Sequence, residues 1–403
     1  MKNEAELKRL YEWSAAELKD LLDTYMKYVY DPAGGFYGEV TRGLEARRGA
    51  DRAIVLNGRI MWVFASAYRV LKNPRYLEMA NHAMAYIQKY FVDPAFGGAY
   101  WHVRADGSPA DETKYPYGIS FVIYAGAELA RASGSREAAA LARKMYDDLE
   151  THALDKAHGG YYEAFARDWK RLDCSFNIKD ASLGSKALNT HLHLIESYTN
   201  LMRVDGDPAV RAKVGSLIDV MTAKLLDLDH FHYKPYMTDN WGATDTLFSY
   251  GHDIEGAWLL TEALEAYGDE ALIERHRDKS VRIAASCEAG LNPETGGLYS
   301  EGDEGGPFDL RMIHWVQAEA VVGFFNAYQL TGDEHFLSLT LNVADYIKKH
   351  LSDREGGVYR TWLSHGGAGA GDRANAHIAD AWKCPYHDGR MCLELIERIE
   401  KMI

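Results

Sequence analysis

The chain repeats one short glycine-containing turn at a nearly constant interval, and this repeat constrains the fold more than any other feature. Neighbouring Gly-Gly pairs lie 60 to 63 residues apart, except across one gap of double length that a degenerate copy fills. Six copies indicate a repeat architecture, in which each unit buries its apolar face against its neighbours. The copies are "DPAGGFYGE" (31–39), "DPAFGGAYW" (93–101), "DKAHGGYYE" (155–163), the degenerate "DLDHFHYKPY" (227–236), "NPETGGLYS" (292–300) and "DREGGVYRT" (353–361).

The segments between these turns predict two helices per unit. Runs such as "NGRIMWVFASAYRVL" and "QAEAVVGFFNAYQLTG" combine helical periodicity with strong helix formers, and Gly closes several of them. About sixty residues accommodate two helices of ~12 to 15 residues and their connections. We therefore expect an all-α chain of six helical hairpins, or twelve helices.

Hairpins of this kind can extend as an open solenoid or close into a ring of inner helices surrounded by outer ones. Closure is favoured because individual units carry distinct polar insertions, as expected when the loops of one rim form a single site. The turns predict short β-hairpin loops at that rim, with Gly at positive φ. No composition break divides the chain, so we expect one domain, 1–403. The Gly-rich "SHGGAGAGDRANAH" (364–377) lacks the ending of a phosphate loop, and we interpret it as a loop or lid.

Composition and charge argue against several classes of partner. The formal net charge is -14 and no Lys/Arg cluster stands out, so neither nucleic acid nor an anionic membrane is expected to bind. The N-terminus is charged and no run approaches ~20 apolar residues, which predicts a cytoplasmic protein. The four cysteines form no CxxC pair, as is typical of free thiols in a reducing compartment. The 26 Tyr and 9 Trp would suit either a sugar-binding cleft or an aromatic core.

Motifs of several common enzyme sites are absent. The chain has no GxSxG elbow, no HExxH, no Walker A loop and no GxGxxG opening a βαβ unit, and its Cys and His residues lack zinc spacing. We therefore expect neither a metal nor a cofactor. The sequence carries no pattern that indicates an oligomeric state.

The segment "NTHLHLIESY" places His191 and His193 in one predicted helix. At 100° per residue their side chains point ~200° apart, so they cannot share one metal or one proton. His193 shares a face with Asn189 and Glu196, which is either a solvated face or part of a site. We interpret His191 as a buried scaffold residue.

Two further clusters carry residues suited to proton transfer. In "SYGHDIEGAWLL", His252 and Glu255 are three residues apart, and a neighbouring carboxylate would orient the imidazole. A surface ion pair is the alternative, but the apolar neighbours argue against it. In "AWKCPYHDGRMCLE", Trp382, His387 and Arg390 surround a proline before a predicted helix. These clusters favour histidine acid/base chemistry in an aromatic-lined cavity.

At these clusters the chain resembles the N-acylglucosamine 2-epimerase superfamily, most closely its cellobiose 2-epimerases. The matching segments run from end to end in the expected order. They are "IVLNGRIMWVFASAYR" (54–69), "KYPYGISFVIYA" (114–125), "LNTHLHLIESYTNL" (188–201), "YGHDIEGAWLL" (250–260), "WVQAEAVVGFFNAYQ" (315–329) and "WKCPYHDGRMCLE" (382–394).

The resemblance implies an (α/α)6 barrel that acts on a sugar without metal or cofactor. In this family the sugar ring opens, a base removes the C2 proton to give a cis-enediolate, and reprotonation from the opposite face inverts C2. By resemblance, His193 and His387 are the two C2 acid/bases, and His252 with Glu255 is the ring-opening pair. The remaining implied residues are Arg59 and Tyr117 at O1 and O2, Asn189 at a sugar hydroxyl, and Trp315 and Trp382 as stacking platforms.

The sequence departs from the family pattern at two positions. His314 stands before Trp315 where two adjacent tryptophans are common, and Ile119 stands where Gln is frequent. Together with the 364–377 insertion, these changes point to regions that decide whether a disaccharide or only a monosaccharide fits. The preferred expectation is a cellobiose 2-epimerase, and the alternative is a monosaccharide epimerase or a mannose/fructose isomerase. A glycoside hydrolase, which needs two carboxylates across the scissile bond, and a non-enzymatic sugar-binding protein are less favoured.

Overall fold

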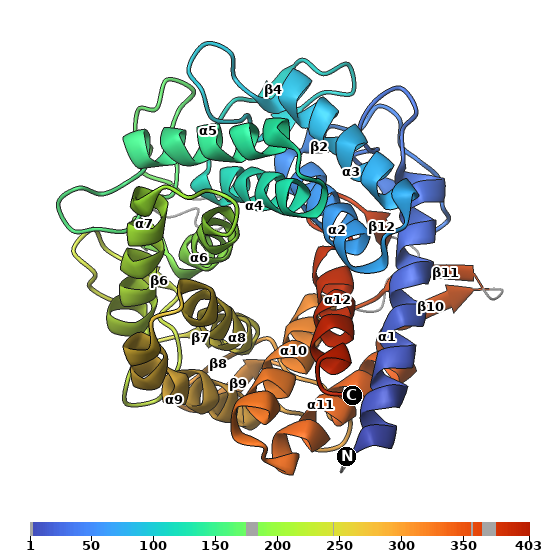
Figure 1. Cartoon of the computed structure of the whole chain (residues 1–403), viewed down its shortest axis with the longest axis vertical. Helices are drawn as coiled ribbons and strands as arrows, with labels where there is room; N and C mark the ends of the chain where they lie inside the picture. Colours follow the sequence, from blue (N-terminus) through green and yellow to red (C-terminus); the bar gives the residue numbers. More distant parts are fainter. Residues whose placement is uncertain (1–2, 175–183, 245, 356–357, 365–375) are drawn as a thin grey trace.

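Figure 1 shows the computed structural model of the chain, which describes residues 3–174, 184–244, 246–355, 358–364 and 376–403. Within these residues, twelve α-helices stand in two concentric rings, with the even-numbered helices inside and the odd-numbered helices outside. The inner helices are α2 (Ile54–Leu71), α4 (Pro116–Ser133), α6 (Leu188–Met202), α8 (Tyr250–Tyr267), α10 (His314–Thr331) and α12 (Tyr386–Glu400). The outer helices are α1 (Glu4–Thr24), α3 (Pro74–Tyr86), α5 (Arg136–His152), α7 (Pro208–Asp219), α9 (Glu270–Ser286) and α11 (Glu334–Tyr346).

The predicted closed barrel of six helical hairpins is confirmed. Helix α1 packs against α12, so the first and last repeats meet and the ring has no open end (Figure 1). The Tyr25 hydroxyl, just after α1, donates to the Ile378 carbonyl at 2.6 Å and adds to this junction. The buried apolar residues form one continuous core, to which inner and outer helices both contribute.

Helix boundaries follow the sequence signals of each unit. An Asn, Ser or Asp side chain caps five of the outer helices by accepting a hydrogen bond from a backbone amide of the first turn. Four inner helices are followed by a residue with a left-handed backbone conformation, and three of these four residues are glycines. The capping residues are Asn73, Ser135, Asp207, Asp269 and Asp333, and the left-handed residues are Lys72, Gly134, Gly268 and Gly332.

Short antiparallel strands occupy the loops that lead into the inner helices. They pair as β1 with β12, β10 with β11, β5 with β6, and as the three-stranded sheets β2-β3-β4 and β7-β8-β9. The strands are β1 (Val40–Thr41), β2 (Arg52–Ala53), β3 (His102–Val103), β4 (Pro109–Asp111), β5 (Lys186–Ala187), β6 (Tyr236–Met237), β7 (Phe248–Ser249), β8 (Glu301–Asp303), β9 (Gly306–Asp309), β10 (Ser352–Glu355), β11 (Val358–Trp362) and β12 (His377–Ala379).

The repeated turns form the expected hairpins. In the second copy, Gly97 and Gly98 have φ values of 74° and 66°, which only glycine adopts without strain. The degenerate fourth copy has Phe231 in this region, at φ 60°. Antiparallel bridges close the turns at Tyr30–Phe36, Val92–Ala99, Leu154–Tyr161, Leu226–Tyr233 and Leu291–Leu298, with the sixth copy closed by β10 and β11.

A buried ion pair ties each of the first three turns to the following inner helix. A cation two residues before the helix binds the aspartate that opens the turn. The pairs are Arg52–Asp31 (2.5 Å), Lys114–Asp93 (3.2 Å) and Lys186–Asp155 (2.8 Å).

Helix α2 is long and apolar enough to cross a membrane by length and composition alone. Of its 18 residues, 78% are buried inside the barrel, which accounts for its apolar character as an inner helix. Of the 364–377 loop, residues 365–375 lie outside the described part of the chain, so the interpretation as a lid stays a prediction.

Candidate active site

All nine predicted site residues lie at one end of the barrel. The inner helices alternate with antiparallel outer helices, so their N-terminal ends point the same way and their first turns surround one region. The residues are Arg59 on α2, Tyr117 on α4, Asn189 and His193 on α6, His252 and Glu255 on α8, Trp315 on α10, and Trp382 and His387 just before and within α12.

His193 forms a buried pair with Glu196, as their spacing on α6 indicated. Nδ1 of His193 lies 2.8 Å from Oε1 of Glu196. A carboxylate only accepts hydrogen bonds, so with Glu196 ionised Nδ1 carries the proton and Nε2 keeps its lone pair. Burial lowers the pKa of His193 well below its ordinary value, so the imidazole is neutral and Nε2 can act as a base.

His387 repeats this arrangement with a partner from another helix. Its Nδ1 lies 2.7 Å from Oε1 of Glu319 on α10, and the Trp258 indole donates to the other oxygen of Glu319 at 2.9 Å. Burial also lowers the pKa of His387 well below its ordinary value. The sequence reasoning missed Glu319, whose only signal was a charged residue inside the largely apolar run "VQAEAVVGFF".

Arg390 joins the two histidine–carboxylate pairs. Its guanidinium is fully buried and donates to Glu196 at 2.5 Å, to Glu319 at 2.7 Å and to Glu255. The Tyr386 hydroxyl donates a further hydrogen bond to Glu196 at 2.6 Å. A single cation therefore holds three carboxylates in place. This pairing offsets the cost of burying the charges away from water.

His252 and Glu255 are neighbours on α8, as predicted, and their role as the ring-opening pair stays a prediction. Glu255 is bound by Arg390, and within the described residues no hydrogen bond joins it to His252. Burial lowers the pKa of His252, although the charge of Glu255 opposes this shift. The spacing of three residues was correct, but a guanidinium from α12 competes for the carboxylate, and sequence spacing cannot show this.

Arg59 is a buried cation without a carboxylate partner among the described residues. Only 4% of its surface is exposed, and its guanidinium donates to the Tyr117 hydroxyl at 2.8 Å and contacts Sγ of Cys384 at 4.0 Å. Its Nε has no hydrogen-bond partner in the part of the chain that the structure describes. Such a cation is available to a negatively charged oxygen of a bound molecule.

The aromatic residues connect these groups. The Trp315 ring lies 4.9 Å from the His252 ring and 5.5 Å from the His387 ring. The Tyr117 ring lies 5.0 Å from the His193 ring and 6.2 Å from Trp382, which is 48% exposed. One line of contacts leads from the buried His193 through Tyr117 to the exposed Trp382, so the site has a deep polar end and an aromatic outer end.

Asn189 presents an oxygen that is ready for a ligand. Its Oδ1 is buried and has no hydrogen-bond partner among the described residues. Because Asn189 precedes His193 by one turn of α6, this oxygen lies on the same face as the histidine.

Among the residues that the structure describes, two groups of donor atoms have a spacing that could hold a metal ion. One atom from each of His193, Glu196 and Glu255 lies within 4.8 Å of the others, and the same holds for Glu255, Glu319 and His387. In both groups the Arg390 guanidinium already bonds to the carboxylates and supplies the positive charge there. The expectation of a metal-independent site stays a prediction.

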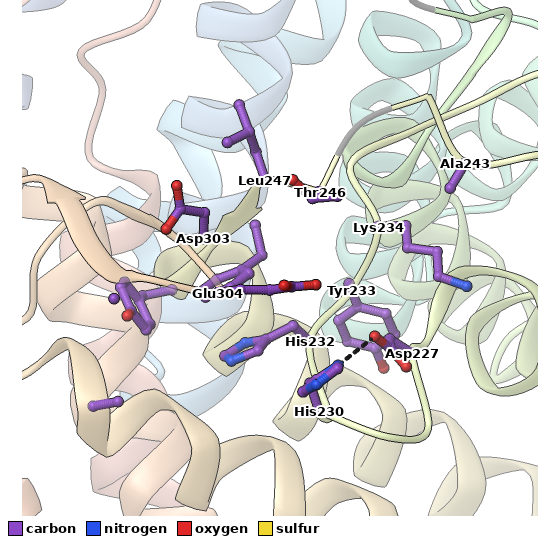
Figure 2. Close-up of a pocket in the computed structure, with 14 residues that line it drawn as sticks. Asp227, His230, His232, Tyr233, Lys234, Ala243, Thr246, Leu247, Asp303 and Glu304 are labelled. Atoms are coloured by element: carbon purple, nitrogen blue, oxygen red, sulfur yellow. Dashed lines mark hydrogen bonds and ion pairs between the residues drawn. The ribbon is translucent and has the colours of Figure 1, made fainter.

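A separate cavity of about 680 Å³ lies at the degenerate fourth repeat (Figure 2). Phe248 stands two residues before α8, where the first three units have a cation, and its ring stacks on His232 at 3.6 Å. Asp227 of this turn pairs with His230 at 2.9 Å instead (Figure 2). None of the nine site residues lines this cavity, so it is distinct from the candidate active site.

Residues 35–379 match the family model described as N-acylglucosamine 2-epimerase (GlcNAc 2-epimerase). The cellobiose 2-epimerase of Bacteroides fragilis is 39% identical over 378 residues, covering 93% of this chain and 95% of that protein. The solved cellobiose 2-epimerase of Bacillus thermoamylovorans superimposes with a TM-score of 0.90 at 34% identity, covering 97% of this chain and 100% of the other. A D-mannose isomerase of Marinomonas mediterranea is 23% identical and covers 95% of this chain and 96% of its own length.

Proposed function

The chain belongs to the N-acylglucosamine 2-epimerase family of carbohydrate epimerases, and from this premise we propose that it inverts C2 of the reducing-end glucose of cellobiose or a related β-1,4 disaccharide. The product from cellobiose would be the 4-O-glucosyl-mannose. The observation that carries the proposal is the pair of buried histidines, each with Nδ1 bonded to its own carboxylate. This arrangement leaves two Nε2 atoms for proton transfer, as an inversion by two bases requires.

Ring opening comes first, because the C2 proton is acidic only when C1 is a free aldehyde. The hydroxyl at O1 must lose a proton and O5 must gain one. We assign these transfers to His252, which Trp315 holds in ring contact beside His387. The neutral imidazole that burial favours can accept the O1 proton and then return it to O5.

Inversion then proceeds through a cis-enediolate. One histidine is neutral and takes the C2 proton through Nε2, which makes it an imidazolium. The other must enter the step as an imidazolium, with protons on both Nδ1 and Nε2, and becomes neutral when its Nε2 delivers a proton to C2 from the opposite face. The negative charge that develops on O1 and O2 would be stabilised by the Arg59 guanidinium and the Tyr117 hydroxyl, which already bond to each other. Removal of one such donor typically costs about 3 to 4 kcal/mol of transition-state stabilisation.

A monosaccharide enzyme is the second candidate. His314 replaces one of two adjacent tryptophans common in the family, which would remove an aromatic surface for a second sugar. The same enediolate reprotonated at C1 would convert mannose to fructose.

The test is to incubate purified protein with cellobiose and with mannose separately in D2O, with and without EDTA. We expect glucosyl-mannose labelled with deuterium at C2, formed equally with the chelator. Activity on mannose alone would favour the second candidate, and free glucose from cellobiose would indicate a hydrolase. Product without deuterium would exclude the enediolate route.

A further inference from the structure

Trp382 lies in a tight turn whose two end residues, Asp380 and Lys383, are hydrogen-bonded to each other. Oδ1 of Asp380 accepts hydrogen bonds from the backbone amides of Trp382 at 2.8 Å and Lys383 at 2.7 Å, and the Asp380 amide donates to the Lys383 carbonyl at 2.9 Å. This geometry fixes the backbone of residues 380–383. The orientation of the turn toward the barrel then depends on what holds the Lys383 side chain.

Lys383 enters a cluster with two helix residues, named here the rim cluster: His314, Lys383 and Asp388. Nζ of Lys383 lies 3.1 Å from Oδ2 of Asp388 and 3.1 Å from Nδ1 of His314, which in turn lies 3.0 Å from Oδ1 of Asp388. The three side chains are 12%, 1% and 14% exposed for Lys383, Asp388 and His314, so solvent screens the contacts little.

The two contacts of His314 Nδ1 exclude each other. A ring nitrogen with a proton donates to Asp388 and repels the lysine, whereas one with a lone pair accepts from Lys383. The ion pair of Lys383 and Asp388 persists in both cases. Lys383 therefore carries the link between the Trp382 turn and α12, and His314 adds a link from α10.

The link through Lys383 positions the aromatic outer end of the site. Contacts lead from the buried Arg59 to Tyr117, and from the Tyr117 ring to the exposed Trp382, which also meets Trp101 at 5.9 Å. A sugar with C1 and C2 at Arg59 would direct its substituents toward Trp382. A second sugar unit would meet this ring, whereas the reacting carbons would not.

We propose that the rim cluster is a specificity device: it holds the Trp382 turn in place and thereby sets the affinity for the second sugar of a β-1,4 disaccharide. This inference rests on the proposed function. His314, Lys383 and Asp388 act as positioning residues, and the ring of Trp382 makes the contact with the sugar.

The test compares Lys383→Met with Lys383→Arg, Trp382→Ala and the double variant Lys383→Met/Trp382→Ala. Loss of a charge-assisted anchor should raise KM for cellobiose about tenfold in Lys383→Met while kcat stays within about twofold. Lys383→Arg should restore most of the affinity, and the double variant should have the KM of Trp382→Ala, because coupled residues are not additive. The matched control is Lys144→Met, which removes an exposed lysine paired with Asp148 on α5.

Hydrogen exchange of the peptide that contains residues 380–385 separates this inference from the proposed function. In Lys383→Met these amides should exchange faster than in the wild type, whether or not the wild type turns over cellobiose. Unchanged exchange, additive effects in the double variant, or a fall in kcat without a change in KM would each overturn the role of the cluster. A wild type inactive on cellobiose with normal purity and folding would instead overturn the proposed function.

Discussion

At the scale of single residues, the carboxylate beside each histidine decides which ring nitrogen is the base. We predict that Glu196→Gln and Glu319→Gln each lower kcat by about 10²- to 10⁴-fold, the usual contribution of a general acid/base group. Glutamine keeps the shape, but its amide can donate to Nδ1 and move the proton to Nε2. Steady-state kinetics would measure the loss, and circular dichroism would check the fold.

Glu128→Gln is the matched control for these variants. Glu128 is also buried, but it bonds to Arg69 and Asn200 instead of a histidine. We expect this control to lose stability and to keep its kcat. A glutamine variant at position 196 or 319 with wild-type kcat would contradict the role of the carboxylates.

The protonation of Glu196 predicts how kcat/KM changes at low pH. Burial raises the pKa of Glu196 to about 7, although Arg390 and Tyr386 oppose the shift. Below this pH the protonated carboxyl would donate to Nδ1 of His193, and Nε2 would carry a proton and cease to be a base. We expect kcat/KM to fall as the pH drops through about 7 and to be constant just above it. Initial rates in both directions of epimerisation, from pH 5 to pH 9, would measure this, and a rate unchanged down to pH 5 would contradict it.

At the scale of the helices, the fourth residue of three inner helices binds the backbone of the repeated turn before it. His191 on α6, Asp253 on α8 and Gln317 on α10 each accept a hydrogen bond from the backbone amide of the preceding turn, at 3.1, 2.7 and 2.7 Å. Ile119 is the fourth residue of α4 and is 1% exposed. Its position and burial favour a role of Ile119 in the scaffold, and the expected effect on substrate size stays a prediction.

His191 and Gln317 occupy equivalent positions on their helices. We therefore predict that His191→Gln makes the free energy of unfolding less sensitive to low pH. Burial lowers the pKa of His191 to about 4, so between pH 6.5 and pH 4 the unfolded chain gains a proton there that the folded chain cannot accept. The free energy of unfolding falls as the pH drops through this window. His191→Gln should match the wild type at pH 7 and lose less stability at pH 5, as urea unfolding at both values would show.

His191→Ala is the contrasting variant for this prediction. It leaves the Tyr161 amide and the Ala187 carbonyl without their side-chain partner, at a cost of about 1 to 3 kcal/mol for each buried polar group left unsatisfied. Catalysis should persist in both variants because His191 does not contact the histidine–carboxylate pairs. A large loss of kcat in His191→Gln would argue against a purely structural role.

At the scale of the whole molecule, the sequence predicted what depends on local spacing. The repeat interval predicted twelve helices, and the distinct polar insertions of the units favoured a closed ring. The spacing of three residues predicted that His193 and Glu196 share a face. The bond between His387 and Glu319 joins residues 68 positions apart, and the contacts of Arg390 reach three other helices. Such partners depend on how six inner helices converge, which no local pattern encodes.

Closure of the ring predicts that the chain unfolds as one unit. Glu17 on α1 accepts hydrogen bonds from the Trp362 indole at 2.6 Å and from Arg354 at 2.8 Å, and so joins the first repeat to the last. Glu17→Leu leaves the buried indole N–H unpaired, and we expect the free energy of unfolding to fall by about 2 to 3 kcal/mol. Glu12→Ala, an exposed position on the same helix, should leave it unchanged.

The distribution of this loss distinguishes one closed domain from a stack of independent repeats. In a single domain, Glu17→Leu should keep one calorimetric transition at a lower temperature, and hydrogen exchange should accelerate in all inner helices, including α6 on the far side of the ring. In an open array, each repeat is stabilised by its neighbours alone, so the loss would be confined to α1, α12 and the strands beside them. A second transition, or exchange that changes only at that junction, would contradict the expectation of one domain over residues 1–403.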